Sequence, residues 1–389
     1  MIPRIYDTVL PSLVQPGRVL ALYGPRRSGK TTLLKNYAAT FAGTLGKVLS
    51  VTGEDISIQE TLGSRSVETI RRFFAGFDCV IIDEAQAAPG IGAGLKLLVD
   101  HLPETRVIIS GSSSFKLAGE VGEPLVGRKT TLNLFPISAA EIVRQGGVPA
   151  LAAALEGFLI YGMYPEILTQ DVNDARRARL LELRDDFLFR DIIAFEGIKN
   201  SAKIRRLLQL LSFQVGKEVS LTELATGVGI SRQVVERYLD LLEKTFVIFR
   251  IGGFSRNLRS EITKSVRYYF ADNGILNALQ NNFVPVGARA DTGALWENWL
   301  VAERVKRNAY FNHPANSYFW RTYAQQEIDW VEEIDGTLSG FEFKWGGKTP
   351  KTPTAWRGAY PDASFSVINR ETYLSFVLPD EATRGGAQE

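Results

Sequence analysis

Residues 18–31, RVLALYGPRRSGKT, join a short apolar run to a glycine-rich loop. The loop from Gly24 to Thr31 fits the pattern G-x-x-x-x-G-K-[S/T], and the amphipathic stretch TLLKNYAATFAG follows it. Strand, loop and helix in this order form a phosphate-binding loop, in which backbone N–H groups and the helix N-terminus face an anion. The alternative is a glycine-rich turn with an exposed lysine. We expect ATP to bind to Gly24, Pro25, Arg26, Arg27, Ser28, Gly29, Lys30, Thr31 and Thr32.

A second motif supplies the carboxylates that ATP hydrolysis requires. CVIIDEAQ, residues 79–86, is a buried strand candidate that ends on Asp83 and Glu84, at the edge where doubly wound sheets bind ligands. We expect Thr31 and Asp83 to hold Mg²⁺, while Lys30 reaches the β- and γ-phosphates. Glu84 is placed to orient or deprotonate the attacking water. The alternative is a pair of carboxylates merely exposed at the end of a strand.

Two further groups are candidates for the same site. RVIISGSSSF, residues 106–115, is another buried strand that ends in serines, so Ser110 or Ser112 is placed to contact the γ-phosphate or its water. Serines after a strand also form ordinary turns. Arg128, in LVGRKTTLNLFPIS, is a candidate arginine finger, because the charge that develops on the transferred phosphoryl group calls for a rigid cationic donor. The alternative for Arg128 is a surface ion pair.

Apolar runs alternate with helical segments in the first part of the chain. The strand candidates 18–23, 47–51, 78–82 and 106–110 are separated by helical segments at 68–74 and 94–101. This alternation predicts an α/β fold with a doubly wound parallel sheet. We divide the chain into a P-loop ATPase core (1–149), a helical lid (150–200), a winged-helix domain (201–270), a restriction-endonuclease-like α/β domain (271–380) and a disordered tail (381–389).

Length and composition limit the class of protein. The chain has 389 residues with 45% hydrophobic residues, enough for two or three cores. Its first residues lack the pattern of a signal peptide, and no stretch approaches the ~20 apolar residues of a membrane span, so we expect a cytoplasmic protein with no membrane partner. One cysteine and two histidines exclude an intramolecular disulfide and a structural zinc site. Any metal must therefore be held by oxygen ligands.

Residues 201–270 form a basic segment. They contain 12 Lys and Arg against 6 Asp and Glu, a net charge of +6, whereas the whole chain has +2. The expected order of three helices and two strands resembles a winged helix, in which helix 231–244 would face duplex DNA. A winged helix also serves as a protein-contact module, and a solvated basic face is the default for a charge cluster. The expected DNA contacts are Arg232, Gln233 and Arg237 on the helix, with Arg256, Arg259 and Lys264, and also Arg250 and Arg267, on the strands and their loop.

The hairpin EIDWVEEI-DG-TLSGFEFKW, residues 327–345, predicts a second site. If residues 335–336 form a two-residue turn, Asp329 lies opposite Glu342. Facing carboxylates destabilise a sheet unless a proton or a cation lies between them. With Glu297 and Lys344, they resemble the metal-dependent nuclease pattern PD-(D/E)XK, although Ile328 replaces the proline. We expect a second Mg²⁺ or Mn²⁺ there, with a salt-bridge lattice as the alternative.

Several segments resemble a prokaryotic family of AAA+-type P-loop ATPases with a C-terminal domain of unknown function: GPRRSGKTTLL, VIIDEAQ, ISGSSSFKL, VGRKTTLNLFPISAAE and YGMYPEIL. The resemblance implies an AAA+-like sheet and ATPase roles for Lys30, Thr31, Asp83 and Glu84, and it matches Arg128 to the family's Gly-Arg. A finger that acts in trans would require a homo-oligomer.

The function that these observations favour is that of an ATP-dependent, DNA-binding ATPase. Family analogy points to a motor or remodeller of branched or forked DNA, with a metal-dependent nuclease domain as a candidate activity. The alternative is an ATP-driven regulatory switch that binds a protein partner and carries a degenerate nuclease-like domain.

Overall fold

The computed structural model describes residues 2–112, 125–196, 201–256, 265–347 and 349–379. The predicted DNA contacts Arg259 and Lys264, and the predicted tail 381–389, lie outside these residues. The chain forms two compact units, an N-terminal unit (Met1–Pro136 with Lys244–Phe246) and a C-terminal unit (Ile137–Glu243 with Val247–Glu389). We describe each unit by itself.

Within the described ranges, no helix combines the length and the apolarity that crossing a bilayer requires.

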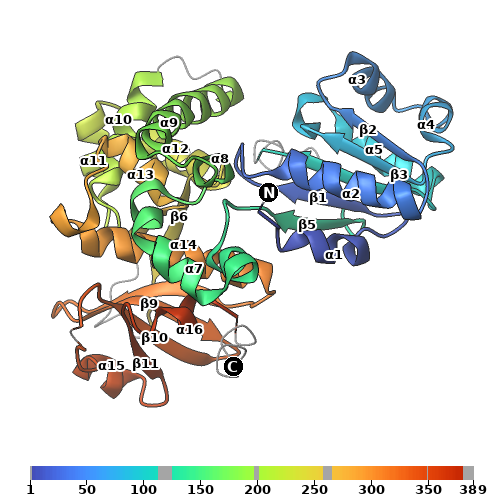
Figure 1. Ribbon diagram of the computed structural model, residues 1–389. Helices are drawn as coiled ribbons and strands as arrows, with labels where there is room; N and C mark the ends of the chain where they lie inside the picture. The colour runs from blue at the N-terminus through green and yellow to red at the C-terminus, as the bar shows by residue number, and fades with distance from the viewer. Residues whose placement is uncertain (1, 113–124, 197–200, 257–264, 348, 380–389) are drawn as a thin grey trace. The chain divides into compact units, whose positions relative to one another are not determined.

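The N-terminal unit alternates strands and helices, as Figure 1 shows. Its elements are α1 (Tyr6–Leu13), β1 (Val19–Tyr23), α2 (Lys30–Thr44), β2 (Val48–Thr52), α3 (Ile56–Gly63), α4 (Val67–Phe74), β3 (Cys79–Asp83), the 3₁₀ turn η1 (Ala85–Ala87), α5 (Ile91–His101), β4 (Arg106–Gly111) and β5 (Lys129–Asn133).

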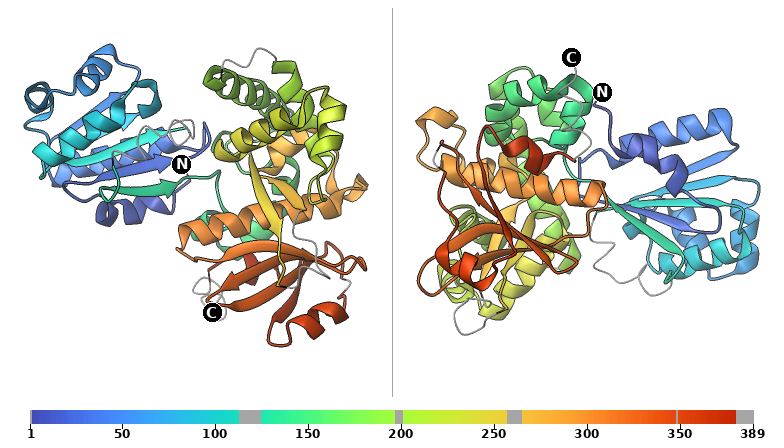
Figure 2. Two further views of the ribbon diagram at one scale, coloured as in Figure 1. Left: turned by 180° about the vertical axis from the view of Figure 1, so that it is seen from behind. Right: turned by 90° about the horizontal axis from the view of Figure 1, so that it is seen from below.

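These strands form a parallel sheet in the order β2-β3-β4-β1-β5. The strands β1, β3 and β4 are almost wholly buried and consist of apolar, mostly branched residues, which suits the centre of a parallel sheet. The helices α1 and α2 pack together, and α3, α4 and α5 pack together (Figure 2). The parallel α/β sheet predicted from the sequence is confirmed, with each of the four predicted strands shifted by no more than one residue.

The strand β5 was not predicted. Its sequence KTTLN has no apolar run, and its residues are at most half-buried because it lies at the edge of the sheet. Its pairing with β1 runs from Val19 opposite Lys129 to Tyr23 opposite Asn133. Tertiary pairing therefore decides the conformation of a segment whose own pattern is that of a loop.

The C-terminal unit begins with helices and ends with a mixed sheet. Its elements are α7 (Ala139–Tyr161), α8 (Pro165–Leu168), α9 (Asn173–Glu196), α10 (Ser201–Ser212), α11 (Leu221–Val228), α12 (Arg232–Lys244), β6 (Ile248–Gly253), β7 (Val266–Phe270), α13 (Asn273–Gln280), the 3₁₀ turn η2 (Val286–Ala288), α14 (Thr292–Tyr310), β8 (Asn316–Arg321), β9 (Glu327–Ile334), β10 (Thr337–Phe343), α15 (Thr354–Ala359), β11 (Ser364–Ile368) and α16 (Tyr373–Val377).

The helices of the basic segment start where the sequence places their caps. The hydroxyl of Ser220 accepts a hydrogen bond from the backbone N–H of Glu223, and that of Ser231 accepts one from Val234. On α12, Tyr238 and Leu242 lie on the buried face, whereas Arg232, Gln233 and Arg237 are exposed. The predicted division of this helix into an apolar stripe and a polar face is confirmed.

The strands of the C-terminal unit are ordered β11-β10-β9-β8-β6-β7. The hairpin register is as predicted from Ile334 opposite Thr337 to Trp330 opposite Phe341, where the paired residues end. Direct pairing of Asp329 with Glu342 stays a prediction. Asp335 and Gly336 both have positive φ, 48° and 80°, as a two-residue turn with matching twist requires.

The strand β6 also pairs in parallel with β8, so the two strands expected to form a wing belong to the same sheet as the hairpin. The further division into lid, winged-helix and nuclease-like domains stays a prediction.

The backbone of Gly24 lies so close to Leu134 that a side chain would not fit, which predicts opposite effects for two Gly→Ala variants. A Cβ atom at Gly24 would lie 2.0 Å from the carbonyl oxygen of Leu134, whereas one at Gly43, inside α2, would meet nothing within 4 Å. We expect Gly24→Ala to displace the start of the phosphate loop, lower the unfolding midpoint and abolish nucleotide binding. Gly43→Ala should raise stability by ~0.5–1 kcal/mol, because alanine loses less backbone entropy in a helix. Thermal unfolding and fluorescent-nucleotide titration measure both, and normal binding by Gly24→Ala would contradict this account.

Candidate functional site

The phosphate loop turns its backbone through left-handed residues just before α2. Arg27 and Gly29 have φ values of 59° and 100°, and the N–H of Ser28 donates to the carbonyl of Pro25 over 3.3 Å. Consecutive turns of this kind point N–H groups toward one concave side, where an anion binds. The exposed side chains of Arg26 and Arg27 add positive charge beside it.

The side chain of Lys30 folds back onto the first residues of the phosphate loop. Its side chain is buried, and its Nζ donates to the carbonyl oxygens of Gly24 and Pro25 over 2.8 and 2.9 Å. Both acceptors are neutral, so phosphate oxygens, which carry charge, form stronger hydrogen bonds with the ammonium group. The group is thus held at the mouth of the loop, in reach of a bound phosphate.

The residues expected to hold Mg²⁺ fit an octahedral ion. The hydroxyl of Thr31, in the first turn of α2, donates to Oδ2 of Asp83 over 2.7 Å. Adjacent oxygen ligands of Mg²⁺ lie about 3.0 Å apart when each is about 2.1 Å from the ion. The two oxygens therefore already lie at nearly the separation that shared coordination requires.

The edge of β3 and β4 orients Asp83 and Glu84. Oδ1 of Asp83 accepts hydrogen bonds from the hydroxyl of Ser110 and, over 3.1 Å, from the N–H of Glu84. The backbone of Glu84 adopts the left-handed conformation, with φ 48°. Its carboxylate accepts a hydrogen bond from the side-chain amide of Gln86. Ser112 is buried just after β4, at the same edge. Ser110 therefore holds Asp83 in place, whereas metal binding by Asp83 and contact between Ser112 and nucleotide stay predictions.

Arg4 supports the loop, and sequence reasoning missed it. Its buried guanidinium donates to the carbonyl oxygens of Ser28 and Phe135, the second over 2.7 Å. It thereby ties the phosphate loop to the segment that follows β5. The surrounding sequence, IPRIYDTVL, has no motif that marks Arg4, because its partners are backbone groups far away in the chain.

Arg128 lies at the opposite end of the parallel sheet from the phosphate loop. Its carbonyl accepts from the N–H of Val19, at the start of β1, whereas the loop follows the end of β1. The five residues of β1 span ~13 Å at about 3.3 Å per residue. The side chain makes an ion pair of 2.7 Å with Asp100. Arg128 is therefore too far away to contact phosphates bound in its own chain, and a role in trans stays a prediction.

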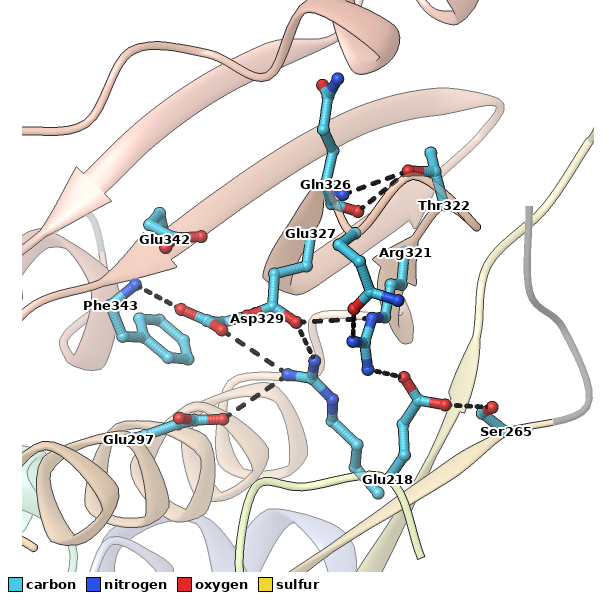
Figure 3. A network of polar contacts seen from close by, with 12 residues as sticks. Glu218, Ser265, Glu297, Arg321, Thr322, Gln326, Glu327, Asp329, Glu342 and Phe343 are labelled. Atoms are coloured by element: carbon cyan, nitrogen blue, oxygen red, sulfur yellow. Dashed lines mark hydrogen bonds and ion pairs between the residues drawn. The ribbon is translucent and has the colours of Figure 1, made fainter. Parts of the chain in front are cut away.

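The predicted nuclease residues gather in one cluster of the C-terminal unit (Figure 3). Asp329 on β9 accepts a hydrogen bond of 2.9 Å from the N–H of Phe343, and Lys344 makes an ion pair of 2.7 Å with Glu342. Glu297, on α14, accepts a hydrogen bond of 2.8 Å from the hydroxyl of Tyr269. Counting across the hairpin therefore located a real concentration of acidic groups.

Arg267 enters the same cluster, contrary to its predicted role in contacting DNA phosphates. It is buried and ion-paired to Glu297, Glu327 and Asp329. The sequence VRYYF of β7 does not reveal this, because the partners of Arg267 come from α14 and β9. Within the described residues, no group of three or more Asp, Glu, His or Cys side chains is arranged to hold a metal ion.

Burial raises the pKa of several carboxyl groups in the cluster. For Glu297 and Glu342, burial is the largest cause and the negative charge of Asp329 the second. The pKa of Asp329 is also raised by burial. Burial by itself would lower the pKa of Arg267, but Tyr269 and the surrounding carboxylates raise it instead. The cluster therefore favours protons or fixed cations over bare negative charge.

The predicted DNA contacts have unequal surroundings. The side chain of Arg232 is 64% exposed and pairs with Glu236 one helical turn away, over 3.0 Å. Gln233 and Arg237 are exposed on the same helix. Arg256 makes an ion pair of 2.7 Å with Glu333. Arg232, Gln233 and Arg237 are thus exposed to solvent, as is Arg250 on β6, but α12 also exposes Glu236 and Asp240, so its surface charge is mixed.

Three family models match consecutive parts of the chain. Residues 16–143 match the model of an AAA domain, which covers β1 to β5. Residues 152–285 and 292–376 match two domains of unknown function, DUF8612 and DUF4143. The AAA domain and the C-terminal domain of unknown function inferred from the motifs are therefore confirmed.

The relatives in sequence include an uncharacterized protein of Mycobacterium tuberculosis. It is 27% identical over 366 residues, which cover 93% of this chain and 77% of the relative. An uncharacterized protein of Methanocaldococcus jannaschii is 23% identical over 342 residues, 81% of this chain and 72% of the relative. Among solved structures, replication initiator DnaA bound to AMPPCP and single-stranded DNA aligns with a TM-score of 0.33 and 16% identity, over 62% of this chain and 86% of that chain.

The position of Arg128 predicts complementation between two inactive proteins. We expect Arg128→Ala to leave nucleotide binding unchanged and to slow hydrolysis by at least about 10³-fold, the scale of an arginine finger. Mixing it with Glu84→Gln should partly restore phosphate release, because some interfaces then combine an intact Glu84 with an intact Arg128. Asp100→Ala is the control, since it breaks the same ion pair but keeps the arginine. Equal slowing by Asp100→Ala, or no rescue on mixing, would reduce Arg128 to a structural role.

Proposed function

We propose that the N-terminal unit binds ATP with Mg²⁺ and hydrolyses it. The observation that carries this proposal is the hydrogen bond of 2.7 Å between Thr31 and Asp83, which brings the start of the loop helix and the end of β3 to one point. When bound there, Mg²⁺ would neutralise charge on the β- and γ-phosphates. The match of residues 16–143 to an AAA domain supports the same activity.

The chain's own residues divide the chemistry between them. Lys30 exchanges the carbonyl oxygens of Gly24 and Pro25 for phosphate oxygens and so holds the nucleotide. Glu84 accepts a proton from the attacking water or orients it, and it can do so while one of its oxygens accepts from the amide of Gln86. Loss of either residue therefore affects a different step.

We further propose that the C-terminal unit couples this ATPase to DNA. The exposed Arg232, Gln233 and Arg237 on α12 support this idea, as does the net +6 of residues 201–270. Forked and branched DNA are the target class to test first, with a motor or remodeller as the activity and an oligomer as the working form. In this proposal the nuclease-like region binds DNA or supports the fold.

A protein partner is the second candidate. Phe213, which follows α10, has 59% of its surface exposed, and large exposed aromatic side chains are frequent in protein interfaces. Two of the expected DNA contacts are also engaged, since Arg256 pairs with Glu333 and Arg267 is buried. The protein would then be an ATP-driven switch whose nucleotide state changes the affinity for that partner.

Two substitutions at the nucleotide site should separate binding from turnover. Lys30→Ala should abolish productive ATP binding, because it removes the ammonium group at the mouth of the loop. Glu84→Gln should retain binding and lower kcat by about 10²–10⁴-fold, the usual effect of a general acid–base group. Fluorescent-nucleotide titration and phosphate release measure the two steps. Normal turnover by Glu84→Gln would overturn its assignment, and activity without added Mg²⁺ would overturn that of Thr31 and Asp83.

The salt dependence of binding should distinguish DNA from a protein partner. Each phosphate contact contributes about 0.9 to the slope of log K against log salt for duplex DNA. We expect the double variant Arg232→Ala, Arg237→Ala to bind forked DNA more weakly and to flatten the slope by about 1.8. The control is Arg71→Ala, Arg72→Ala, which removes the same charge from the exposed face of α4. An unchanged slope, with no stimulation of the ATPase by single-stranded, duplex, forked or four-way DNA, would favour the protein partner.

A further inference from the structure

A guanidinium group lies at the centre of the acidic cluster in the C-terminal unit. Arg267, on β7, is 3% exposed, and its Nη2 lies 2.9 Å from Oε2 of Glu327. Its Nη1 lies 3.5 Å from Oδ1 of Asp329 and 3.8 Å from Oε1 of Glu297. Two of the carboxylates that the nuclease pattern would give to a metal ion therefore face one nitrogen of this arginine.

The charges of the cluster show why a cation belongs there. Among the described residues, three positive side chains face five carboxylates, which gives a formal charge of −2. The positive groups are Arg267, Arg321 and Lys344, and the carboxylates are Glu218, Glu297, Glu327, Asp329 and Glu342. Breaking a buried ion pair by removing one partner is costly, because it leaves charge without compensation. The cluster without Arg267 would thus need either protons or another cation.

The arginine occupies the space that such an ion would need. Mg²⁺ binds carboxylate oxygens at about 2.1 Å, and an ion shared by Asp329 and Glu297 would lie between oxygens that both face Nη1. Contact with that nitrogen and repulsion by its charge exclude the ion. Among the described groups, Nε of Arg267 is buried with no hydrogen-bond partner, while Cζ lies 4.5 Å from the ring centroid of Phe319. The carboxylates attract the charge of Arg267, and the ring of Phe319 packs against its guanidinium group.

We propose that Arg267 fills a divalent-cation site, so that the chain itself supplies the positive charge around which Glu297 and Asp329 are arranged. Removal of the guanidinium opens the site to Mn²⁺ or Mg²⁺, with Glu342 as the next ligand, because Asp329 accepts a hydrogen bond from the N–H of the adjacent Phe343. An ion at the position of Nη1 would lie 3.5 Å from Oδ1 of Asp329 and 3.8 Å from Oε1 of Glu297. Binding at about 2.1 Å therefore requires each oxygen to approach by about 1.4–1.7 Å, which side-chain rotation can supply. This inference concerns the C-terminal unit alone and does not depend on ATP hydrolysis.

The test is Mn²⁺ binding by the full-length, nucleotide-free protein, measured by electron paramagnetic resonance. We expect Arg267→Ala and the bulkier Arg267→Met to bind about one more Mn²⁺ per chain than the wild type. Adding Asp329→Asn to either variant should remove the gain, whereas binding that does not depend on Asp329 belongs to another site. Millimolar Mn²⁺ should also raise the unfolding midpoint of both variants, because a ligand that binds the folded state stabilises it.

Each other outcome would decide against the proposal. Mn²⁺ binding by the wild type that Asp329→Asn abolishes would mean that Arg267 does not block the site. Variants that fold, with native near-ultraviolet circular dichroism, but gain no Mn²⁺ would mean that the carboxylates do not form a metal site. If both variants are unfolded, millimolar Mn²⁺ should restore their circular dichroism, and failure to do so would also overturn the proposal.

Discussion

The nucleotide site depends on the parallel register of β1, β4 and β3. Tyr23, at the end of β1, pairs with Gly111 on β4, and Ile82 on β3 pairs with Ile109. The loop after β1 and the carboxylate at the end of β3 therefore meet at one edge. A slip of one residue would move Asp83 by about 3.3 Å. That displacement would break its hydrogen bond of 2.7 Å to Thr31. The packed apolar strands thus position the carboxylate that we propose as a metal ligand, although their own side chains lie in the core.

The sequence predicts those parts of the molecule whose cause is local. The phosphate loop, the apolar strands and the turn at Asp335 and Gly336 each follow from neighbouring residues. The turn also predicts the register of the hairpin as far as Trp330 and Phe341, because strand pairing counts residues evenly from it. Features set by distant partners were missed: the edge strand β5, the anchoring of the loop by Arg4, and β11, which pairs in parallel with β10.

Net charge by itself overstates the basic surface of residues 201–270. Arg267 contributes to the +6 but is buried among carboxylates, and Arg256 faces Glu333. Their partners lie far away in the chain, so a local charge count includes only one side of each pair. Arg232 and Arg237 remain exposed on α12, but Glu236, Asp240 and Glu243 are exposed on the same helix, so its surface charge is mixed. The case for DNA binding rests on these two arginines and on the exposed Arg205 and Arg206 of α10.

Two of the buried cations, Lys30 and Arg267, lie in different electrostatic surroundings. Lys30 donates to the carbonyl oxygens of Gly24 and Pro25, and charged phosphate oxygens form stronger hydrogen bonds with an ammonium group than neutral carbonyls do. Arg267 already faces three carboxyl groups, so it has no uncompensated charge for an anion and leaves no room for a cation. A lysine in that position would offer a single compact charge, whereas the planar guanidinium reaches carboxylates on α14 and β9 at once. The first cation is therefore arranged to receive a ligand, and the second replaces one.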